Sequence, residues 1–432
     1  MPNVCKDEIV RLIRRLTLVL ALLAAFALGS GAAALAGEET LTFFSKPIAV
    51  EGHGVVQRTE LVESPNVDGY VVGMSADVVD NTGRVQGDED IMLHHIVVAK
   101  IGTPDLTCTG LLAERFYAEG EERTKMALPE GYGYPNRASD GWGMLYMLMN
   151  HRGERLTGRV RYTVRYVTER PLIPVKPVWL DIRNCGSSEF DVPGTGKKGS
   201  TFTKTWDYTI PEGGALVAGG GHLHGGGIRL ELRNATCGTT PFTSLPTWGG
   251  SEPKPILHES GPRKMSSFAS AAGIPVSAGD RLQLAAVYDN ARPHVRAMGI
   301  MLLYLTPAAT PGCRPTPDLT LDLGQPGLPP PFTMPLPRAP RGPLYRDIQE
   351  TWVGDRRYGH ERISIRAKTA FTWRFVGRET HDVTLASGPV GFSSPALRRG
   401  TFRYRFTRAG TYRLYCSLHP TRMTQVITAR GR

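Results

Sequence analysis

Apolar and polar side chains alternate along short segments through most of this chain. Such a period-2 pattern is typical of strands that bury one face. The clearest examples are the run Val160, Tyr162, Val164 and Tyr166 and the shorter run Ile228, Leu230 and Leu232. Forty-nine glycines and 33 prolines interrupt the alternation, and little of the chain shows a helical period. The pattern predicts an all-β protein of antiparallel β-sandwiches, whose sheets pack face to face.

Length and proline content divide the chain into several parts. A chain of 432 residues is long enough for two or three domains. Proline dominates residues 306–343, and the run GQPGLPPPFTMPLPRAPRGP predicts a stiff, extended linker. We therefore expect tandem sandwiches over residues 37–188 and 189–315, a linker over residues 316–342 and a further sandwich over residues 343–432.

The N-terminus has the pattern of an export signal over residues 1–36. Basic residues that include Arg14 and Arg15 precede an apolar run over residues 16–28, and a small-residue cleavage site follows at 34–36. The route would be Sec, or the twin-arginine pathway that the paired arginines suggest. An uncleaved anchor is the alternative. We expect the mature protein to be secreted or held in the cell envelope.

A set of potential metal ligands lies close to the C-terminus. Cys416, His419 and Met423 form a C-x2-H-x3-M motif after an alternating strand, and His381 lies upstream in THDVTL. One thiolate and two imidazoles with a weak axial thioether suit a copper ion that carries one electron. The motif therefore predicts a type 1, or blue, copper centre.

These residues resemble the cupredoxin family, plastocyanin and pseudoazurin especially, over residues 343–432. The resemblance rests on GTYRLYCSLHPTRM and the separate HDV. It implies a Greek-key β-sandwich in which Cys416 points inward at a strand end. Alternation supports the same fold: Phe402, Tyr404 and Phe406 share one face, and Tyr412 and Leu414 share a face with the cysteine.

Earlier histidines occur in three compact settings. They are His94-His95 in DIMLHHIVVA, His151 in MLYMLMNHRG, and His222 with His224 in AGGGHLHGGG. Side chains at i and i+2 of a strand face the same side, so the last pair can chelate one ion of copper, zinc, iron or nickel. Adjacent strand residues face opposite sides, so the first pair can share an ion only through a bulge or twist.

In this order, the three settings resemble the copper type II, ascorbate-dependent monooxygenases, the family of peptidylglycine alpha-hydroxylating and dopamine beta-monooxygenases. That family has two linked sandwiches with one copper in each. The resemblance implies an electron-supplying site and a catalytic, oxygen-activating site, for up to two type 2 coppers. The implied ligands are His94, His95 and His151 in the first site, and His222, His224 and Met298 in the second.

Two details qualify this second resemblance. Met301 competes with Met298 as the thioether ligand, although the position of Met298 relative to its apolar strand favours it. The peptide-amidating enzymes bind their substrate carboxylate through side chains at the positions of Gly220, Ile300 and Leu302, none of which can do so here. We therefore do not expect a glycine-extended peptide as the substrate, and the site should be apolar and lined by glycine. We expect His294, close to this site in sequence, at the surface.

Four cysteines remain once the signal and the copper motif are set aside. They are Cys108, Cys185, Cys237 and Cys313. Export favours disulfides, but four cysteines allow three connectivities and the sequence does not choose between them. If each domain closes its own loop, the first two pair with each other and so do the last two.

Positive charge is concentrated at the C-terminus. Residues 343–432 hold 17 Lys and Arg against 6 Asp and Glu, which equals the net charge of +11 of the whole chain. No nucleic-acid-binding motif accompanies this charge, and export also argues against such a partner. An acidic redox partner, an anionic envelope surface or the preceding domains of the chain would fit it, and so would an ordinary solvated surface.

Together, the patterns imply an exported copper oxidoreductase. The leading hypothesis is an O2-dependent monooxygenase that hydroxylates a small molecule or exposed C–H bond, with electrons relayed through the fused blue copper domain. The alternative is a non-catalytic electron-transfer or copper-handling protein in which only the blue copper is redox active. A zinc hydrolase is a third possibility, but no glutamate lies near His222 and His224 in a general-base motif.

Overall fold

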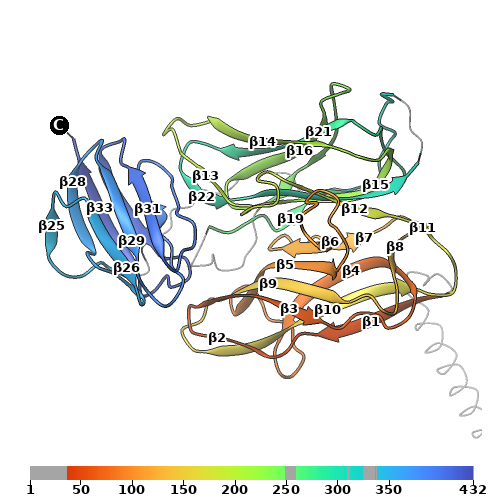
Figure 1. The fold of residues 1–432 in the computed structure, drawn as a ribbon, viewed down its shortest axis with the longest axis horizontal. Helices are drawn as coiled ribbons and strands as arrows, with labels where there is room; N and C mark the ends of the chain where they lie inside the picture. The colour runs from red at the N-terminus through yellow and green to blue at the C-terminus, as the bar shows by residue number, and fades with distance from the viewer. Residues whose placement is uncertain (1–36, 249–258, 309–311, 325–335, 337, 432) are drawn as a thin grey trace, which may run out of the picture. The chain divides into compact units, whose positions relative to one another are not determined.

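The computed structural model describes residues 37–248, 259–308, 312–324, 336 and 338–431. The expected signal lies outside these residues, as does part of the proline-rich linker. The described residues form strands and no helix, so the all-β prediction is confirmed (Figure 1). Accordingly, no helix in these ranges has the length and hydropathy to cross a membrane. Three β-sandwiches follow one another along the chain.

The first sandwich packs two sheets against each other, and their strands are antiparallel except for the parallel pair β8-β11. One has the order β1-β10-β4-β8-β11, with β2 on β10 and β7 on β4, and the other has the order β3-β9-β5-β6. Its strands are β1 (Glu38–Phe44), β2 (Ile48–Val50), β3 (Val55–Val62), β4 (Gly69–Val79), β5 (Ile91–Ile101), β6 (Ala113–Gly120), β7 (Met126–Ala127), β8 (Tyr132–Asn136), β9 (Trp142–Asn150), β10 (Leu156–Val167) and β11 (Ile173–Pro174).

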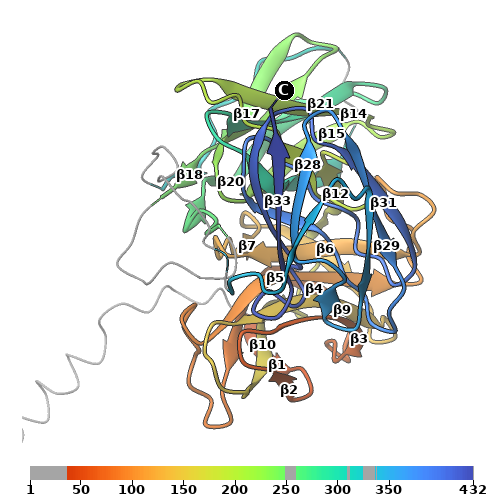
Figure 2. The same ribbon diagram turned by 90° about the vertical axis from the view of Figure 1, so that its left-hand side faces the viewer.

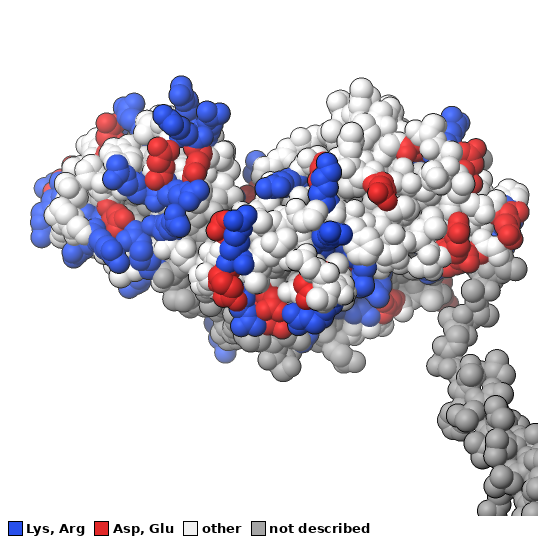
Figure 3. Space-filling view, turned by 90° about the horizontal axis from the view of Figure 1, so that it is seen from below, with Lys and Arg blue, Asp and Glu red and all other residues white. Residues whose placement is uncertain are grey.

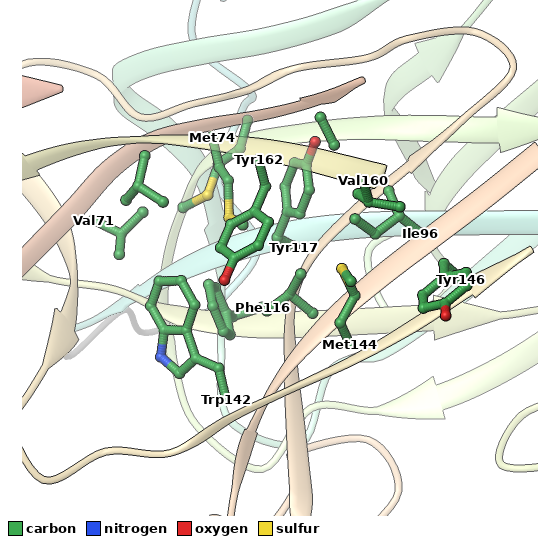
Figure 4. Packing of buried hydrophobic residues seen from close by; sticks show 14 of the residues in the cluster. Val71, Met74, Ile96, Phe116, Tyr117, Trp142, Met144, Tyr146, Val160 and Tyr162 are labelled. Carbon is green, nitrogen blue, oxygen red and sulfur yellow. The ribbon is translucent and has the colours of Figure 1, made fainter. Parts of the chain in front are cut away.

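The predicted alternation builds the core of this sandwich. Val160, Tyr162, Val164 and Tyr166 on β10 are fully buried. Figure 4 shows some of these side chains packed with others from both sheets, including the ring of Trp142. The polar residues between them on β10 point away from the core, as a period of two requires.

The second sandwich has a five-stranded sheet, β12-β23-β15-β20-β24, and a four-stranded sheet, β14-β21-β16-β17. The pairs β13-β22 and β18-β19 form small separate sheets. Its strands are β12 (Lys176–Asp181), β13 (Phe190–Val192), β14 (Thr201–Thr209), β15 (Gly214–Leu223), β16 (Gly227–Asn234), β17 (Thr239–Ser244), β18 (Pro246–Thr247), β19 (Lys264–Met265), β20 (Ser267–Val276), β21 (Arg281–Asp289), β22 (His294–Ala297), β23 (Gly299–Pro307) and β24 (Leu321–Asp322).

Two boundaries of this sandwich differ from the predicted ones. β12 pairs with β23, so the second sandwich begins before the expected boundary at residue 188. β24, inside the predicted linker, pairs with β20 and covers the exposed edge of its sheet. Both observed boundaries differ from the predicted ones because the hydrophobic pattern of a strand does not indicate which sheet the strand joins.

The third sandwich contains parallel as well as antiparallel pairs. Its sheets have the orders β25-β28-β33-β32-β30 and β27-β26-β29-β31, and β33 and β28 are seen in front in Figure 2. β28 is parallel to both β25 and β33. The strands are β25 (Leu344–Arg346), β26 (Glu350–Gly354), β27 (Arg357–Tyr358), β28 (Arg362–Arg366), β29 (Ala370–Phe375), β30 (Thr384–Ser387), β31 (Gly400–Arg405), β32 (Gly410–Tyr415) and β33 (Thr424–Arg430).

The first two sandwiches pack directly against each other. Val217, Ala218 and Tyr304 of the second sandwich belong to the hydrophobic cluster of the first, and the Tyr304 hydroxyl donates a 2.8 Å hydrogen bond to the carbonyl oxygen of Phe116. The sheet that contains β15 and β23 therefore faces the sheet that contains β5 and β6. Side chains that point outward from both sheets meet in the space between them.

Two disulfides, Cys108–Cys185 and Cys237–Cys313, have the pairing expected if each domain closes its own loop. However, only the second disulfide closes a loop within one domain. Cys108 lies between β5 and β6 of the first sandwich, whereas Cys185 follows β12 of the second. The first disulfide therefore joins two sandwiches.

The two disulfides allow a matched comparison. Because their cysteines are 77 and 76 residues apart, loop-closure entropy predicts that replacing either pair by alanine costs about 4 kcal/mol. We expect similar losses in denaturant unfolding. If the histidines predicted as ligands in the first two sandwiches bind a metal, the Cys108→Ala/Cys185→Ala variant should also weaken that binding, because its disulfide joins these sandwiches. The Cys237→Ala/Cys313→Ala variant should leave that binding intact. Equal metal binding by both variants would show that the first disulfide has no such role.

A buried carboxyl group makes stability depend on pH. Glu119 is 4% exposed, accepts hydrogen bonds from the Tyr117 hydroxyl and the Ala76 amide, and has its pKa raised by burial from 4.5 to about 7. The folded protein then binds this proton more tightly than the unfolded chain. The free energy of unfolding should therefore fall as the pH rises from about 4.5 to about 7, by roughly 3 kcal/mol. Glu119→Gln should remove this slope in urea unfolding, whereas exposed Glu130→Gln should retain it.

Candidate metal centres

The third sandwich brings the four predicted cupredoxin ligands together at one end. Cys416 follows β32, and its thiol is fully buried, like the side chains of His381 and Met423. The Nδ1 atoms of His381 and His419 are 3.2 Å apart, and Cys416 Sγ is 3.7 Å from His419 Nδ1. Met423 closes the loop, because its amide donates to the His419 carbonyl and its own carbonyl accepts from the Cys416 amide.

The protonation of these groups suits a cation. The outer Nε2 of His419 lies 3.3 Å from Glu379 Oε2, so it carries the proton and leaves a lone pair on Nδ1. Burial lowers the pKa of His381, and burial followed by the neighbouring His381 lowers the pKa of His419 to about 4. Both rings are therefore neutral, with nitrogens facing each other beside sulfur. Burial also raises the pKa of the Cys416 thiol, so a bound cation is needed to hold the thiolate.

Asp382, next to His381 in the chain, stabilises this centre through hydrogen bonds to the loops that carry the ligands. Its backbone amide points at Cys416 Sγ at 3.5 Å. Its carboxylate accepts hydrogen bonds from the amide and hydroxyl of Ser417, at 2.9 and 2.5 Å, and from the Thr384 hydroxyl. These bonds fix the loops that carry the two ligands before any ion arrives.

A second cluster of histidines lies between the first and second sandwiches. His94 and His95 come from β5, and His222 and His224 come from the end of β15. The Nδ1 atoms of the adjacent pair are 2.8 Å apart, and His95 Nε2 is 3.0 Å from His224 Nε2. The His222 ring centroid is 5.2 Å from that of His95 and 5.0 Å from that of His224. The structure thus gathers four imidazoles from the two predicted sites into one cluster.

Local backbone geometry explains how both pairs reach the cluster. The β5–β9 ladder has a register shift between Leu93 and His95, which is the bulge that two adjacent histidines need to share a site. On β15, Leu223 is fully buried in the core while its two histidine neighbours face outward. This is the shared face predicted for an H-x-H pair.

Acceptors outside the cluster fix the tautomers of three of its rings. His94 Nε2 lies 3.3 Å from Glu121, His222 Nδ1 lies 2.9 Å from Glu122, and His224 Nδ1 lies 2.6 Å from a backbone carbonyl. Each of these acceptors requires a proton on the nitrogen that it contacts. The opposite nitrogen then presents a lone pair to the cluster, the arrangement that orients histidine ligands around metals.

The contacts between these rings call for a positive charge among His94, His95 and His224. If the outer nitrogens of His94 and His224 carry the protons, both nitrogens of His95 face lone pairs, yet a neutral imidazole can donate only one proton. Either one of the three rings is a charged imidazolium or a metal ion lies among them. The ligand atoms of His94, His95 and His224 all lie within 4.8 Å of one another, as a metal site requires.

His222 adds a fourth donor. Within the described residues, its Nε2 is buried and has no hydrogen-bond partner. Burial opposes a charge on this ring, but the Glu122 carboxylate outweighs burial and raises the pKa of His222, so this ring offers a lone pair to a metal only after it releases a proton. A Cβ atom on Gly120 would lie 2.7 Å from the His222 ring, so glycine is needed there for the ring to reach Glu122.

The remaining predicted ligands fall in different surroundings. His151 follows β9 and is not part of the described histidine cluster. The Tyr288 hydroxyl donates to the Met298 carbonyl at 2.5 Å and accepts from the His224 amide at 2.9 Å, so Met298 lies beside the cluster. Met301 is fully buried in the core of the second sandwich, whereas Met298 lines the same cavity as the histidines.

A cavity of about 1580 Å³ adjoins the histidine cluster. Apolar side chains and glycines from the facing sheets line it, including Leu145, Met147, Gly220, Ile300 and Leu302. Residues of the third sandwich also contribute to its wall, among them Leu385, Pro395 and Leu418. Glycines and apolar side chains line much of the wall, as the sequence indicated, but charged side chains such as Arg123, Lys125 and Arg292 line it as well.

Several residues at the site were not identified from the sequence. Glu121 and Glu122 lie in the acidic run AEGEE, which is a signal that could have been noticed. His294, expected at the surface, is 2% exposed, and its Nδ1 lies 2.9 Å from the Glu259 carboxylate, so that expectation was wrong. Arg296 carries no sequence signal, yet the carbonyl that accepts from His224 belongs to it.

Comparison with solved structures finds small cupredoxins. A purple cupredoxin from Nitrosopumilus maritimus is 29% identical, covers 17% of this chain and 81% of its own, and gives a TM-score of 0.16. An oxidised amicyanin variant is 21% identical over 19% of this chain and 80% of its own, with a TM-score of 0.17. An amicyanin variant in the Cu(I) form is 23% identical over the same shares, with the same TM-score. No family model and no curated protein matches the chain.

Proposed function

We propose that this protein is an exported copper oxidoreductase that acts on an apolar substrate with O2. Electrons would pass through a type 1 copper centre in the third sandwich to copper held between the first two. The observation that carries the proposal is the cluster of His94, His95, His222 and His224, whose nitrogens converge beside a large apolar cavity.

Copper fits both donor sets by their chemistry. The cysteine, two histidines and methionine of the third sandwich are the soft and borderline donors of a blue copper centre, and the imidazoles with Met298 suit a second copper that reacts with O2. Copper bound there would supply one-electron chemistry and O2 activation. The chain itself orients the ligands, because Glu121, Glu122 and a backbone carbonyl hold the outer nitrogens of the rings.

The cavity supports the choice of substrate. Its size and apolar lining favour a bulky hydrophobic molecule with an exposed C–H bond. No cation from the positions of Gly220, Ile300 or Leu302 is present to bind a carboxylate. We infer that the apolar part of the wall, which includes Ile300 and Leu302, positions the substrate near the histidines. Hydroxylation by a monooxygenase is the reaction that this combination fits best.

Electron supply from outside is part of the same proposal. Lys and Arg side chains gather over the third sandwich, at the left of Figure 3. Arg398, Arg399, Arg403 and Arg405 are exposed there, and the His419 side chain is 19% exposed. An acidic redox partner is therefore the donor that we favour, since complementary charge speeds encounter. An anionic surface of the cell envelope would be attracted by the same charge.

Metal content tests the two centres separately. We expect wild-type protein to bind copper in both and to give one blue and at least one ordinary Cu(II) signal in electron paramagnetic resonance. Cys416→Ser should remove only the blue signal, and His224→Ala should remove only the ordinary signal. His53→Asn, a histidine outside both sites, should change neither. A wild-type protein with the blue signal alone would instead be an electron carrier or copper-handling protein.

Met298 provides a test of reactivity. Met298→Ile should abolish O2 consumption with a chemical reductant, because the thioether that stabilises the reduced ion is lost, while the blue absorption remains. Met301→Leu is the matched control: it changes a core methionine by a swap that usually costs less than about 1.5 kcal/mol, and it should keep O2 consumption. Full O2 consumption by Met298→Ile would show that Met298 has no role at the reactive site.

A further inference from the structure

Arg296 on β22 makes contacts with both candidate metal centres. Its backbone carbonyl accepts the 2.6 Å hydrogen bond from His224 Nδ1, at the edge of the histidine cluster. Its guanidinium reaches into the third sandwich, where it lies 3.0 Å from the Asp382 carboxylate. Arg296 therefore connects the His224 ring of one candidate site to the Asp382 carboxylate beside the other.

The contact with the third sandwich has several parts. The guanidinium also donates to the Thr384 hydroxyl at 3.1 Å and to the Ser394 carbonyl at 3.3 Å. Asp382 in turn points its amide at Cys416 Sγ, at 3.5 Å. Hydrogen bonds and covalent bonds thus run without a break from the cysteine sulfur, through the aspartate and the arginine, to the imidazole of His224.

Other groups hold Arg296 in an unusual conformation. Its φ angle is +54°, a left-handed value that is rare outside glycine, asparagine and aspartate. The Asp191 carboxylate accepts from its amide at 3.1 Å, and the Glu189 carboxylate accepts from its guanidinium. Strained backbone persists only where the surroundings impose it, and such residues concentrate at functional sites. Here the strain lets the carbonyl face one centre while the side chain faces the other.

We propose that Arg296 is the positioning residue through which electrons pass between the blue copper centre and the histidine cluster. This inference rests on the proposed function, because it needs a redox ion in each site. In each transfer, the ion at Cys416 is oxidised by one electron and the ion at His224 is reduced by one. No covalent bond breaks, and no proton has to move along the path.

The cation also affects the blue centre directly. A guanidinium beside Asp382 neutralises the carboxylate next to the copper ligands and favours the reduced, less positive ion. Its loss should lower the reduction potential of the blue centre. A residue that only clamped two sandwiches together would not produce this shift. Lysine in its place would retain the charge but not the forked hydrogen bonds.

Rapid one-electron reduction of the blue centre tests the proposal. In copper-loaded wild-type protein, the blue absorption should bleach and then recover, at a rate independent of protein concentration, as the electron moves to the second copper. Arg296→Met should slow this recovery by at least an order of magnitude and lower the reduction potential. Arg296→Lys should restore the potential and part of the rate.

Arg408→Met is the matched control. This arginine also reaches the second sandwich, through the Gly194 carbonyl at 3.4 Å, but it is not on the path. Its loss should leave recovery and potential unchanged. If solution scattering shows that Arg296→Met separates the sandwiches, Arg296→Lys becomes the test of the proposal. The blue absorption of that variant should still recover several-fold more slowly than that of the wild type.

The outcomes separate this inference from the proposed function. A wild-type protein that holds no second copper would overturn both. If wild-type protein holds both coppers and recovers, but Arg296→Met and Arg296→Lys recover at the wild-type rate with the wild-type potential, then only the role of Arg296 is overturned.

Discussion

The histidine cluster brings together more inward-facing lone pairs than three neutral imidazoles can satisfy with their own protons. His95 and His224 come from different sandwiches, and their Nε2 atoms are 3.0 Å apart. Acceptors outside the cluster hold the rings with lone pairs pointing inward. One additional proton or a metal ion among the rings would therefore stabilise them. Packing between the sandwiches keeps the rings from moving apart, through Tyr304 and the Cys108–Cys185 disulfide. The contacts that hold the first two sandwiches together therefore also set the distances within the histidine cluster.

Much of the fold could be predicted because alternation reports burial directly. Tyr162 and Tyr166 are buried as their spacing requires, and so are Tyr412 and Leu414. Assignment of strands to sheets was less successful, because that choice depends on pairing between distant segments. β12 therefore joined the second sandwich instead of the first. The sequence left the disulfide connectivity open, and the condition that would have chosen it fails for Cys108–Cys185, which crosses between domains.

In the candidate sites as well, local motifs could be predicted and contacts between distant segments could not. Spacing identified Cys416, His419 and Met423 because their motif lies on one short loop, and the bulge required for adjacent histidines is present. Spacing within each segment could not show that His95 would meet His224, since that distance is set by how two sandwiches face each other. Arg296 had no signal at all, because its role arises from two partners far away in the sequence.

The wall of the cavity has a consequence for how the three sandwiches work together. Leu385, Pro395 and Leu418 of the third sandwich line the same space as Leu145 and Ile300 of the other two. Any molecule large enough to fill that space would touch the third sandwich as well as the histidine cluster. Under the proposed function, its binding would exclude water from the electron donor and the electron acceptor at the same time.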